Sequence, residues 1–244
     1  MDDALELVNY LPVSYGSHSE EEYITFLWDA FQTNYSNGKF EFSGLAFHLL
    51  YMSFVSFSLW RIRVVRPEDF TTALIGFQRE KEGRFLKVDS PFKFYEELKE
   101  SEIFRFLKLL GCENDQVGEF SKFVKRRNKI AHPTGTVFFN DQVSIDREIS
   151  EMMREVGNIQ NHMRPIILEI YRRFLSESWD IENREYAEPA QEIAFNLLHK
   201  NYMSAKDIGF CIAYGLTELS GDVAFPMIES LHKSFAESFG DTAA

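Results

Sequence analysis

The chain has 244 residues, of which 45% are hydrophobic, and its formal net charge at pH 7 is −12. This length and apolar content exclude a disordered chain, because they suffice to bury the core of one large domain, or of one domain with a helical appendage. The net charge repels nucleic acid at long range, so it excludes broad binding by the overall field, and any contact with RNA requires a local basic patch.

The residue usage favours an all-α fold in the cytoplasm. Twenty-four Phe residues, with Gly and Pro spread thinly and without turn clusters, are typical of packed helices rather than of a many-stranded sandwich. The acidic N-terminus does not resemble a signal peptide, and the most apolar segment, 45–60, is shorter than the roughly 20 residues that span a bilayer. We therefore expect no membrane partner. Cys112 and Cys211 lie far apart without metal-type spacing, so we expect reduced, partly buried thiols.

Three helices are predicted in the first third of the chain. Ser17 and Ser19, followed by three Glu residues, predict an N-cap hydroxyl and a helix over 19–34. The long apolar stretch 42–65 predicts the central, most buried helix. Pro67 ends that stretch and fits the first turn of a further helix over 68–79.

The next segment alternates between breakers and apolar runs. Residues 78–90 are charged and contain Gly83, so they predict a loop. The apolar spacing over 94–110 predicts a helix, broken near Ser101 and ended by Gly111.

The second half again shows helical periodicity. A helix is predicted over 114–131, and the run 137–139 is expected either to pair as a strand or to pack. Apolar residues spaced by three and four predict one long core helix over 144–176. The acidic stretch 177–189 looks like a linker, and shorter helices are expected over 190–200, 204–219 and 225–239.

The predicted organisation is therefore an up-down helical bundle over residues 1–178, followed by a C-terminal helical extension over 186–244. The sequence contains no zinc signature, P-loop, nucleophile elbow or dinucleotide fingerprint. We accordingly expect neither a metal nor another cofactor.

Arg127 stands out on the predicted helix 114–131. At 100° per residue it falls near the centre of an apolar stripe made by Phe120, Phe123, Val124, Ile130 and Ala131. An unpaired charge on a core-facing side costs several kcal/mol. Either a carboxylate from another helix pairs with Arg127, or this face lines a cleft or a subunit interface where an anion binds.

Polar and basic groups accompany Arg127. Asn128 and His132 are four residues apart, so they share an edge of the helix, and Pro133 places His132 at a chain bend. The remaining face forms a local basic patch, a candidate RNA-binding surface, made of Lys122, Lys125, Arg126 and Lys129.

Each of these features also has a purely structural explanation. Arg127 can form a buried ion pair, and His132 can bond the last carbonyls of the helix. The basic patch can simply be a solvated face. His48, inside the most apolar stretch, is interpreted as a hydrogen-bonded core histidine rather than a catalytic group.

The run Arg127-Asn128-Lys129-Ile130-Ala131-His132 resembles the signature of the HEPN family, an Arg and a polar residue followed, after a short spacer, by His. The resemblance covers residues 19–176. It implies a helical bundle of HEPN type that forms a homodimer, in which two motifs face each other and make a composite, metal-independent ribonuclease site. Many members of the family are toxins or act in defence against phage.

One position departs from a subgroup of that family. Members regulated by a nucleotidyltransferase antitoxin often carry Tyr two residues after the His, whereas this chain has Thr134. Control through that tyrosine is therefore in doubt, although an antitoxin or another regulatory protein is still an expected partner.

The residues suit ribonuclease chemistry. RNA supplies its own nucleophile, the 2′-hydroxyl, so the protein needs a proton-transfer group and a cation for the charge that develops on the phosphate. In this hypothesis His132 transfers protons, Arg127 holds the phosphate in a bidentate manner, and Asn128 orients His132 or contacts the phosphate. The expected products carry a 2′,3′-cyclic phosphate and a 5′-hydroxyl; RNA, not DNA, is the expected substrate.

A second hypothesis is that the chain is a non-catalytic helical module. It would use the same groove to bind a nucleotide, RNA or a partner protein. The two hypotheses differ in geometry, because only the ribonuclease requires Arg127 and His132 of two subunits to converge across a two-fold axis.

Overall fold

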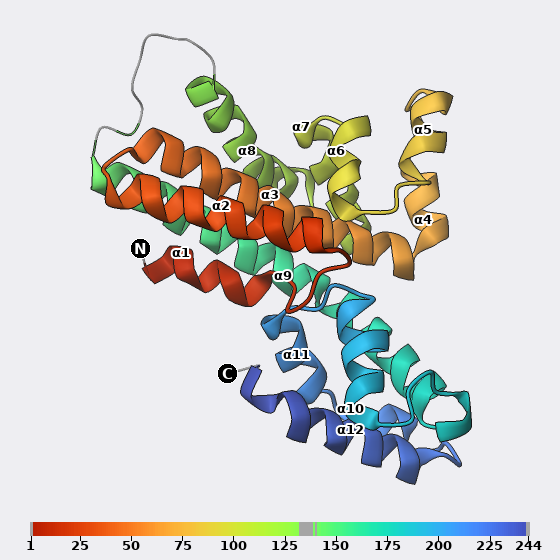
Figure 1. Ribbon diagram of the computed structural model, residues 1–244. Helices are drawn as coiled ribbons and strands as arrows, with labels where there is room; N and C mark the ends of the chain where they lie inside the picture. The colour runs from red at the N-terminus through yellow and green to blue at the C-terminus, as the bar shows by residue number, and fades with distance from the viewer. Residues whose placement is uncertain (1, 132–138, 140, 243–244) are drawn as a thin grey trace. The chain divides into compact units, whose positions relative to one another are not determined.

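The computed structural model describes residues 2–131, 139 and 141–242, and the regular elements of this part of the chain are helices (Figure 1). Its single β pairing is an isolated antiparallel bridge between Pro12 and Ser204. The all-α prediction is therefore confirmed for the described residues. The chain divides into two compact units, the first made of Met1–Val8 and Ser17–His162, the second of Asn9–Gly16 and Met163–Ala244.

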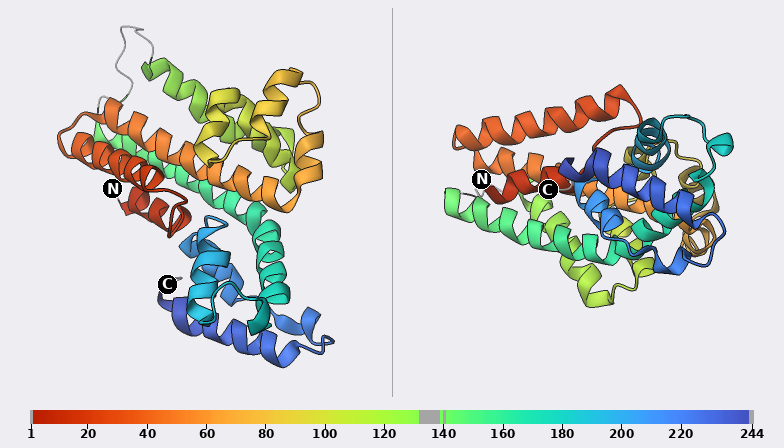
Figure 2. Two further views of the ribbon diagram at one scale, coloured as in Figure 1. Left: turned by 45° about the vertical axis from the view of Figure 1, so that its right-hand side comes forward. Right: turned by 90° about the horizontal axis from the view of Figure 1, so that it is seen from below.

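In the first unit, α2 (His18–Ser36) and α3 (Phe40–Val65) form an antiparallel pair, which Figure 2 shows from two further sides. The predicted N-cap is confirmed, since the Ser17 hydroxyl accepts from the backbone N–H of Glu20 at 3.3 Å. Aromatic rings join the two helices, with the Phe31 and Phe47 centroids 5.2 Å apart.

Helix α3 is the buried centre of this unit, as its apolar sequence predicts. Phe54 and Phe57 are completely inaccessible, and Ser58 bonds back to the carbonyl of Phe54, which satisfies its hydroxyl inside the core. Among the described helices α3 alone is long and apolar enough to cross a membrane, but 83% of its apolar window is buried in the structure. In this structure the apolar surface of α3 therefore packs against the rest of the protein.

The long core helix predicted over 144–176 is confirmed as α9 (Gln142–Ser178). Its first half is bonded into the first unit, where Asp146 accepts from the Tyr35 hydroxyl at 2.5 Å. The division between the two compact units falls inside α9, between His162 and Met163. A domain boundary between residues 178 and 186 stays a prediction.

Of the run 137–139, only Phe139 lies within the described residues. Its backbone N–H donates to Glu41 at 3.1 Å, and its ring lies against Gly44 in the first turns of α3. A Cβ atom at Gly44 would come within 2.9 Å of that ring, so the glycine permits the contact. Of the two predicted alternatives for this run, Phe139 thus packs, against the first turns of α3.

The segment after α3 contains more helix than the sequence indicates. Helix α4 (Pro67–Thr72) begins at the predicted proline but ends early, and α5 (Arg79–Phe85) occupies the predicted loop. The loop prediction was wrong because tertiary packing outweighs the local cost of Gly83. The Phe85 ring is fully buried and stacks on Phe70 with centroids 5.6 Å apart, which holds this turn of helix against the core.

The helix predicted over 94–110 is divided into short pieces. After η2 (Pro91–Lys93), the chain forms α6 (Phe94–Glu97), α7 (Glu100–Ile103) and the 3₁₀ helix η3 (Phe104–Leu110). Gly111 ends η3, as predicted, with a left-handed φ of 82° that suits glycine.

The second unit combines the C-terminal half of α9 with short helices, and the segment Asn9–Gly16 belongs to it through a bond from the Val13 N–H to the Met203 carbonyl at 2.9 Å. The predicted helix 190–200 is an α-helical turn continued as a π-helix. The elements are η4 (Ile181–Asn183), α10 (Pro189–Glu192), η5 (Ile193–His199), α11 (Ala205–Ile212), η6 (Leu216–Leu219), α12 (Phe225–Phe239) and η7 (Gly240–Thr242).

Replacing Ser204 tests the capping of α11. The buried Ser204 hydroxyl accepts from the N–H of Asp207 at 3.2 Å, and the Asp207 carboxylate accepts from the N–H of Ser204 at 2.8 Å. We expect Ser204→Ala to lower the free energy of unfolding by about 1 kcal/mol, because it leaves the backbone N–H of Asp207 without its side-chain acceptor. Chemical denaturation measures this, and the exposed substitution Ser176→Ala in the last turn of α9 serves as the control, for which we expect no loss. Equal stability of the two variants would contradict the role of the cap.

Candidate functional site

Helix α8 (Asn114–Ala131) carries the predicted site residues. Its first half is anchored to α3, because Phe120 and Phe123 are buried and the Phe120 carbonyl accepts from the Tyr51 hydroxyl at 3.0 Å. Beyond Val124 the apolar stripe leaves the core, so Ile130 is half-buried and Ala131 is exposed. Arg127 lies at this transition, between the packed half of α8 and its free end.

The Arg127 guanidinium pairs with a carboxylate of its own chain. Its Nη2 lies 2.5 Å from Oε2 of Glu100 at the start of α7, and the side chain keeps 25% of its surface exposed. The Nε atom of Arg127 is buried and has no hydrogen-bond partner within the described residues. The predicted alternative of an ion pair is thus present, yet the guanidinium is neither fully enclosed nor fully satisfied.

Glu100 also bonds to His48 from the core of α3. The His48 Nε2 atom lies 3.2 Å from the same Oε2 atom of Glu100, and only 1% of the His48 side chain is exposed. Since an ionised carboxylate only accepts, His48 donates from Nε2 and leaves Nδ1 as an acceptor, which is buried and without a partner among the described atoms. His48 is the hydrogen-bonded core histidine that the sequence predicted.

The surroundings lower the pKa of both Glu100 and His48, for different reasons. Burial alone would raise the pKa of Glu100, but hydrogen bonds from His48 and Arg127 outweigh it and lower that pKa to about 2. Burial lowers the pKa of His48, and the positive charge of Arg127 adds to this against the opposing effect of Glu100. At neutral pH the cluster therefore consists of a neutral imidazole, a carboxylate and a guanidinium.

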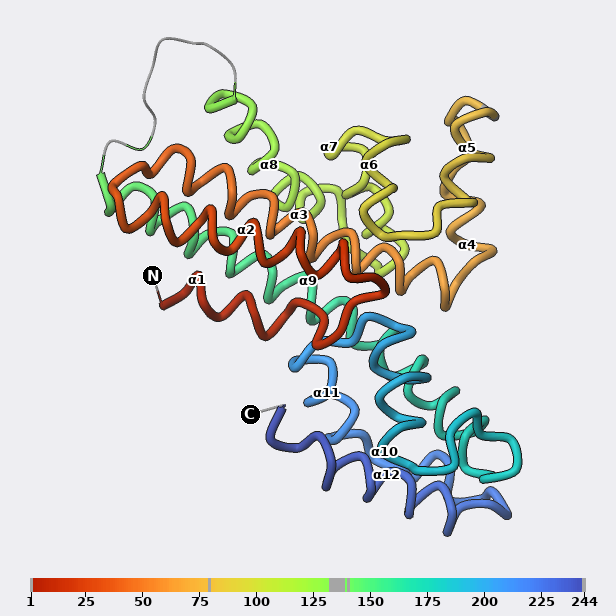
Figure 3. The backbone as a smooth tube through the Cα atoms, viewed as in Figure 1, coloured from red at the N-terminus to blue at the C-terminus, as the bar shows by residue number. Residues whose placement is uncertain are grey.

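Helices α7 and α8, whose backbones Figure 3 traces, contact each other. A cleft of about 350 Å³ opens beside the ion pair, where the segment of α6 and α7 meets α8. Asn128 lines it next to Arg127, so the structure brings these two predicted residues to one cavity. The complete lining is Tyr95, Leu98, Lys99, Glu100, Ser101, Val124, Arg127 and Asn128. Amide, hydroxyl and cationic groups that line a cleft of this size can hold a phosphate-sized anion.

The predicted basic patch divides into two pairs. Lys122 and Arg126 are engaged with the carboxylate of Glu151 on α9, at 3.7 and 2.7 Å, and Arg126 also pairs with Glu148. Lys125 and Lys129 are exposed and have no ion pair within the described residues. RNA binding by these four residues stays a prediction; the geometry leaves only the second pair free to meet an external anion.

The predicted proton-transfer group His132 lies outside the described residues, as does Thr134. Within the described residues, no cluster of three or more His, Cys, Asp or Glu side chains has the arrangement to hold a metal ion. Cys112 and Cys211 are free and buried, as predicted, and burial raises the pKa of Cys112 to about 11.

Comparison of the chain with models of known protein families, with curated protein sequences and with solved structures finds no match.

Sequence reasoning missed Glu100 as a member of this site. The apolar stripe around Arg127 does demand a carboxylate partner, but residues 96, 97, 100 and 102 are all Glu, and sequence alone does not show which of them faces α8. The break between α6 and α7 decides this, because it aims the first residue of α7 at Arg127 and His48.

Lowering the pH tests the neutral state of His48. Its pKa in the folded chain lies below the usual value of 6.5, so its contribution to stability is fully present above that value and is lost as the pH falls below it. We expect the free energy of unfolding of the wild type to decrease from about pH 7 to about pH 5, and to decrease less in His48→Gln, whose amide can still donate to Glu100.

His232 is the matched control, because burial also lowers its pKa while it bonds the Tyr171 hydroxyl in the second unit at 2.7 Å. His232→Gln should keep the part of the pH dependence that His48 causes. Denaturant titrations at each pH measure the slopes, and identical slopes for wild type and His48→Gln would refute a neutral, buried His48.

Proposed function

We propose that this chain is a metal-independent endoribonuclease that resembles the HEPN family, with Arg127, Asn128 and His132 in its active site. The observation that carries the proposal is the place of Arg127: a partly exposed guanidinium, with a buried unsatisfied Nε, on the wall of a cleft that Asn128 also lines. The helical architecture supports it, as does the position of the motif at the end of α8.

In the proposed reaction the RNA 2′-oxygen forms a bond to phosphorus, and the bond from phosphorus to the 5′-oxygen breaks. A base takes the 2′-hydroxyl proton and an acid gives a proton to the leaving oxygen, so no proton is lost or gained overall. His132 is the proton-transfer group, and Arg127 offsets the charge on the non-bridging phosphate oxygens. The products are a 2′,3′-cyclic phosphate and a 5′-hydroxyl.

Glu100 constrains this proposal. Its carboxylate occupies one edge of the Arg127 guanidinium, so an incoming phosphate must use the remaining donors or displace the carboxylate. The same contact favours the second candidate, a non-catalytic module whose Arg127 is structural. In both functions Arg127 stabilises the fold through its ion pair with Glu100. Only in the ribonuclease does Arg127 also bind the phosphate of RNA.

The proposal includes a homodimer, because the family it resembles builds its site from two subunits. Helix α2 exposes two aromatic side chains one turn apart, Tyr23 with 38% and Phe26 with 64% of its surface accessible. We infer that a second copy covers Phe26. Action in the cytoplasm as a toxin or in phage defence, with an antitoxin or other regulator, belongs to the same proposal.

Substituting the motif tests the activity. We expect the purified chain to cleave RNA in the presence of a chelator, and Arg127→Ala and His132→Ala each to lower the rate by about a hundredfold or more, because each removes a group used in the transition state. Cleavage is followed by gel analysis of a labelled RNA, and the 3′-ends are checked for cyclic phosphate. The exposed Lys39→Gln variant is the control, with an unchanged rate expected.

A double-mutant cycle separates activity from structure. If the pair with Glu100 is the only role of Arg127, then Arg127→Gln costs less stability in a Glu100→Gln background, and no RNA is cleaved by any variant. If Arg127 also acts on phosphate, Arg127→Gln abolishes cleavage in both backgrounds, whatever its effect on stability. Cleavage that needs added Mg²⁺, or that survives His132→Ala, would rule the proposed mechanism out.

A charge on the exposed face of α2 tests the dimer. Phe26→Asp should yield a monomer with little cleavage, because it places a carboxylate where the second copy would bury apolar surface. Sedimentation measures the mass, and Phe195→Asp, at a residue 47% exposed in the second unit, is the matched control that should stay dimeric and active. A dimeric and fully active Phe26→Asp variant would exclude this face.

A further inference from the structure

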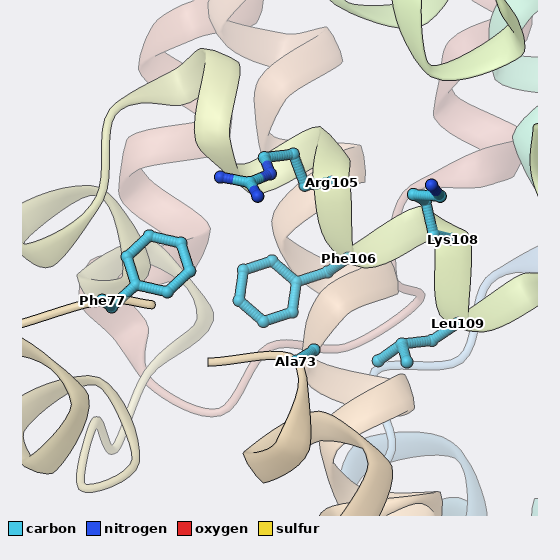
Figure 4. A pocket seen from close by; sticks show the side chains of 6 residues that line it. All are labelled: Ala73, Phe77, Arg105, Phe106, Lys108 and Leu109. Carbon is cyan, nitrogen blue, oxygen red and sulfur yellow. The ribbon is translucent and has the colours of Figure 1, made fainter. Parts of the chain in front are cut away.

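A second pocket, of about 200 Å³, lies in the first unit where the turn after α4 meets the 3₁₀ helix η3 (Figure 4). It shares no residue with the cleft at Arg127. The side chains that line it are Ala73, Phe77, Arg105, Phe106, Lys108 and Leu109. Figure 4 shows the Arg105 guanidinium reaching towards the Phe77 ring, with Phe106 between Phe77 and Leu109.

The 3₁₀ backbone sets this arrangement. In a 3₁₀ helix side chains three residues apart eclipse each other, so Arg105 lies in line with Lys108, and Phe106 with Leu109. Both cations are exposed, whereas Phe106 is 99% inaccessible. One column of the helix thus places two positive charges beside an apolar column that forms the pocket floor.

Phe77 ends a cluster of buried aromatic rings. Phe106 stacks on Phe70 with centroids 4.9 Å apart, and Phe77 lies 6.4 Å from Phe106 at an angle of 18° between the ring planes. Phe77 is half-buried, so the cluster reaches the surface at this ring. Nearly parallel rings at the edge of a rigid cluster offer a platform on which a further planar ring can stack.

The charges at the rim are free to meet an anion. In an acidic chain where Arg84, Lys93 and Arg126 all pair with carboxylates, neither Arg105 nor Lys108 has an ion pair within the described residues. The Arg105 guanidinium lies 5.8 Å from the Phe77 ring centre, and Lys108 donates to the neutral amide oxygen of Asn114 at 2.8 Å.

We propose that this pocket binds a nucleotide, with the base against Phe77, above the buried Phe106, and the phosphate at Arg105 and Lys108. The pocket is smaller than the roughly 300–1,000 Å³ of sites that enclose drug-sized ligands, so it accommodates one planar ring system and leaves the sugar and phosphate outside, where the cations lie. Stacking together with a guanidinium and an ammonium group is the chemistry that holds a base and its phosphate. The nucleotide is either free or part of a single RNA strand.

Titration calorimetry on the full chain tests the site. The probes are AMP, adenosine, inorganic phosphate and a single-stranded hexanucleotide whose 2′-positions are methylated, so that attack by a 2′-hydroxyl is impossible. We expect AMP or the hexamer to bind more tightly than adenosine or phosphate alone. Phe77→Leu should weaken that binding about tenfold or more, because it removes the ring on which the base stacks. The double variant Arg105→Gln/Lys108→Gln should weaken it by about the same factor, because it removes both charges that hold the phosphate.

The control is Lys39→Gln/Lys200→Gln, which removes the same charge from exposed positions elsewhere and should leave binding unchanged. Loss of AMP binding in the pocket variants identifies a free nucleotide as the ligand, and loss of hexamer binding alone identifies an RNA strand. If Phe77→Leu unfolds, Arg105→Gln/Lys108→Gln still tests the pocket, because both of its substitutions are at exposed positions. Absence of binding, binding that both pocket variants retain, or an equal loss in the control would overturn the proposal.

This outcome is independent of the proposed ribonuclease. Arg127→Ala should bind AMP as the wild type does, because Arg127 does not line this pocket. Nucleotide binding here in a chain that cleaves no RNA would refute the ribonuclease and leave the pocket assignment standing.

Discussion

The first unit depends on the compensation of one positive charge at the edge of its core. Arg127 lies on the apolar side of α8, where an isolated guanidinium would be costly, and Glu100 offsets that cost from the first residue of α7. The carboxylate is then itself partly buried, and His48 supplies its second donor from inside α3. Three elements that are far apart in the sequence are thereby tied together at one oxygen atom, and the cleft beside them takes its shape from that junction.

Much of the fold is predictable because the helices are long and their periodicity is unambiguous. The buried α3 and the striped α9 were predicted within two residues at either end, since burial on all sides or on one side leaves a repeated signature in the sequence. Helix α5 was missed for the opposite reason. Five of its seven residues are charged and one is Gly83, and the packing of Phe85 against Phe70 and Phe94 holds this short helix to the core.

The candidate site shows the same contrast between local and distant information. The helical wheel locates Arg127 and Asn128 correctly on one cavity wall, because both belong to a single helix. It cannot locate Glu100, nor the carboxylates of Glu148 and Glu151 that engage Arg126 across 22 and 25 residues. A basic face judged from one helix therefore overstates the charge available to a ligand: of its four cations, Lys125 and Lys129 alone have no ion pair within the described residues.

The 3₁₀ helix η3 shows how the hydrogen-bond register of the backbone decides what a sequence displays. Residues 104–110 read Phe-Arg-Phe-Leu-Lys-Leu-Leu, so the cations recur every three positions and apolar residues fill the other two columns. A 3₁₀ helix turns two of its three columns inwards and the cationic one outwards, whereas an α-helix would rotate Lys108 about 60° away from Arg105. Burial of Phe104, Phe106 and Leu107 within a single turn favours the tighter helix. The same period of three aligns the two charges beside Phe77, so core packing and the pocket have one cause.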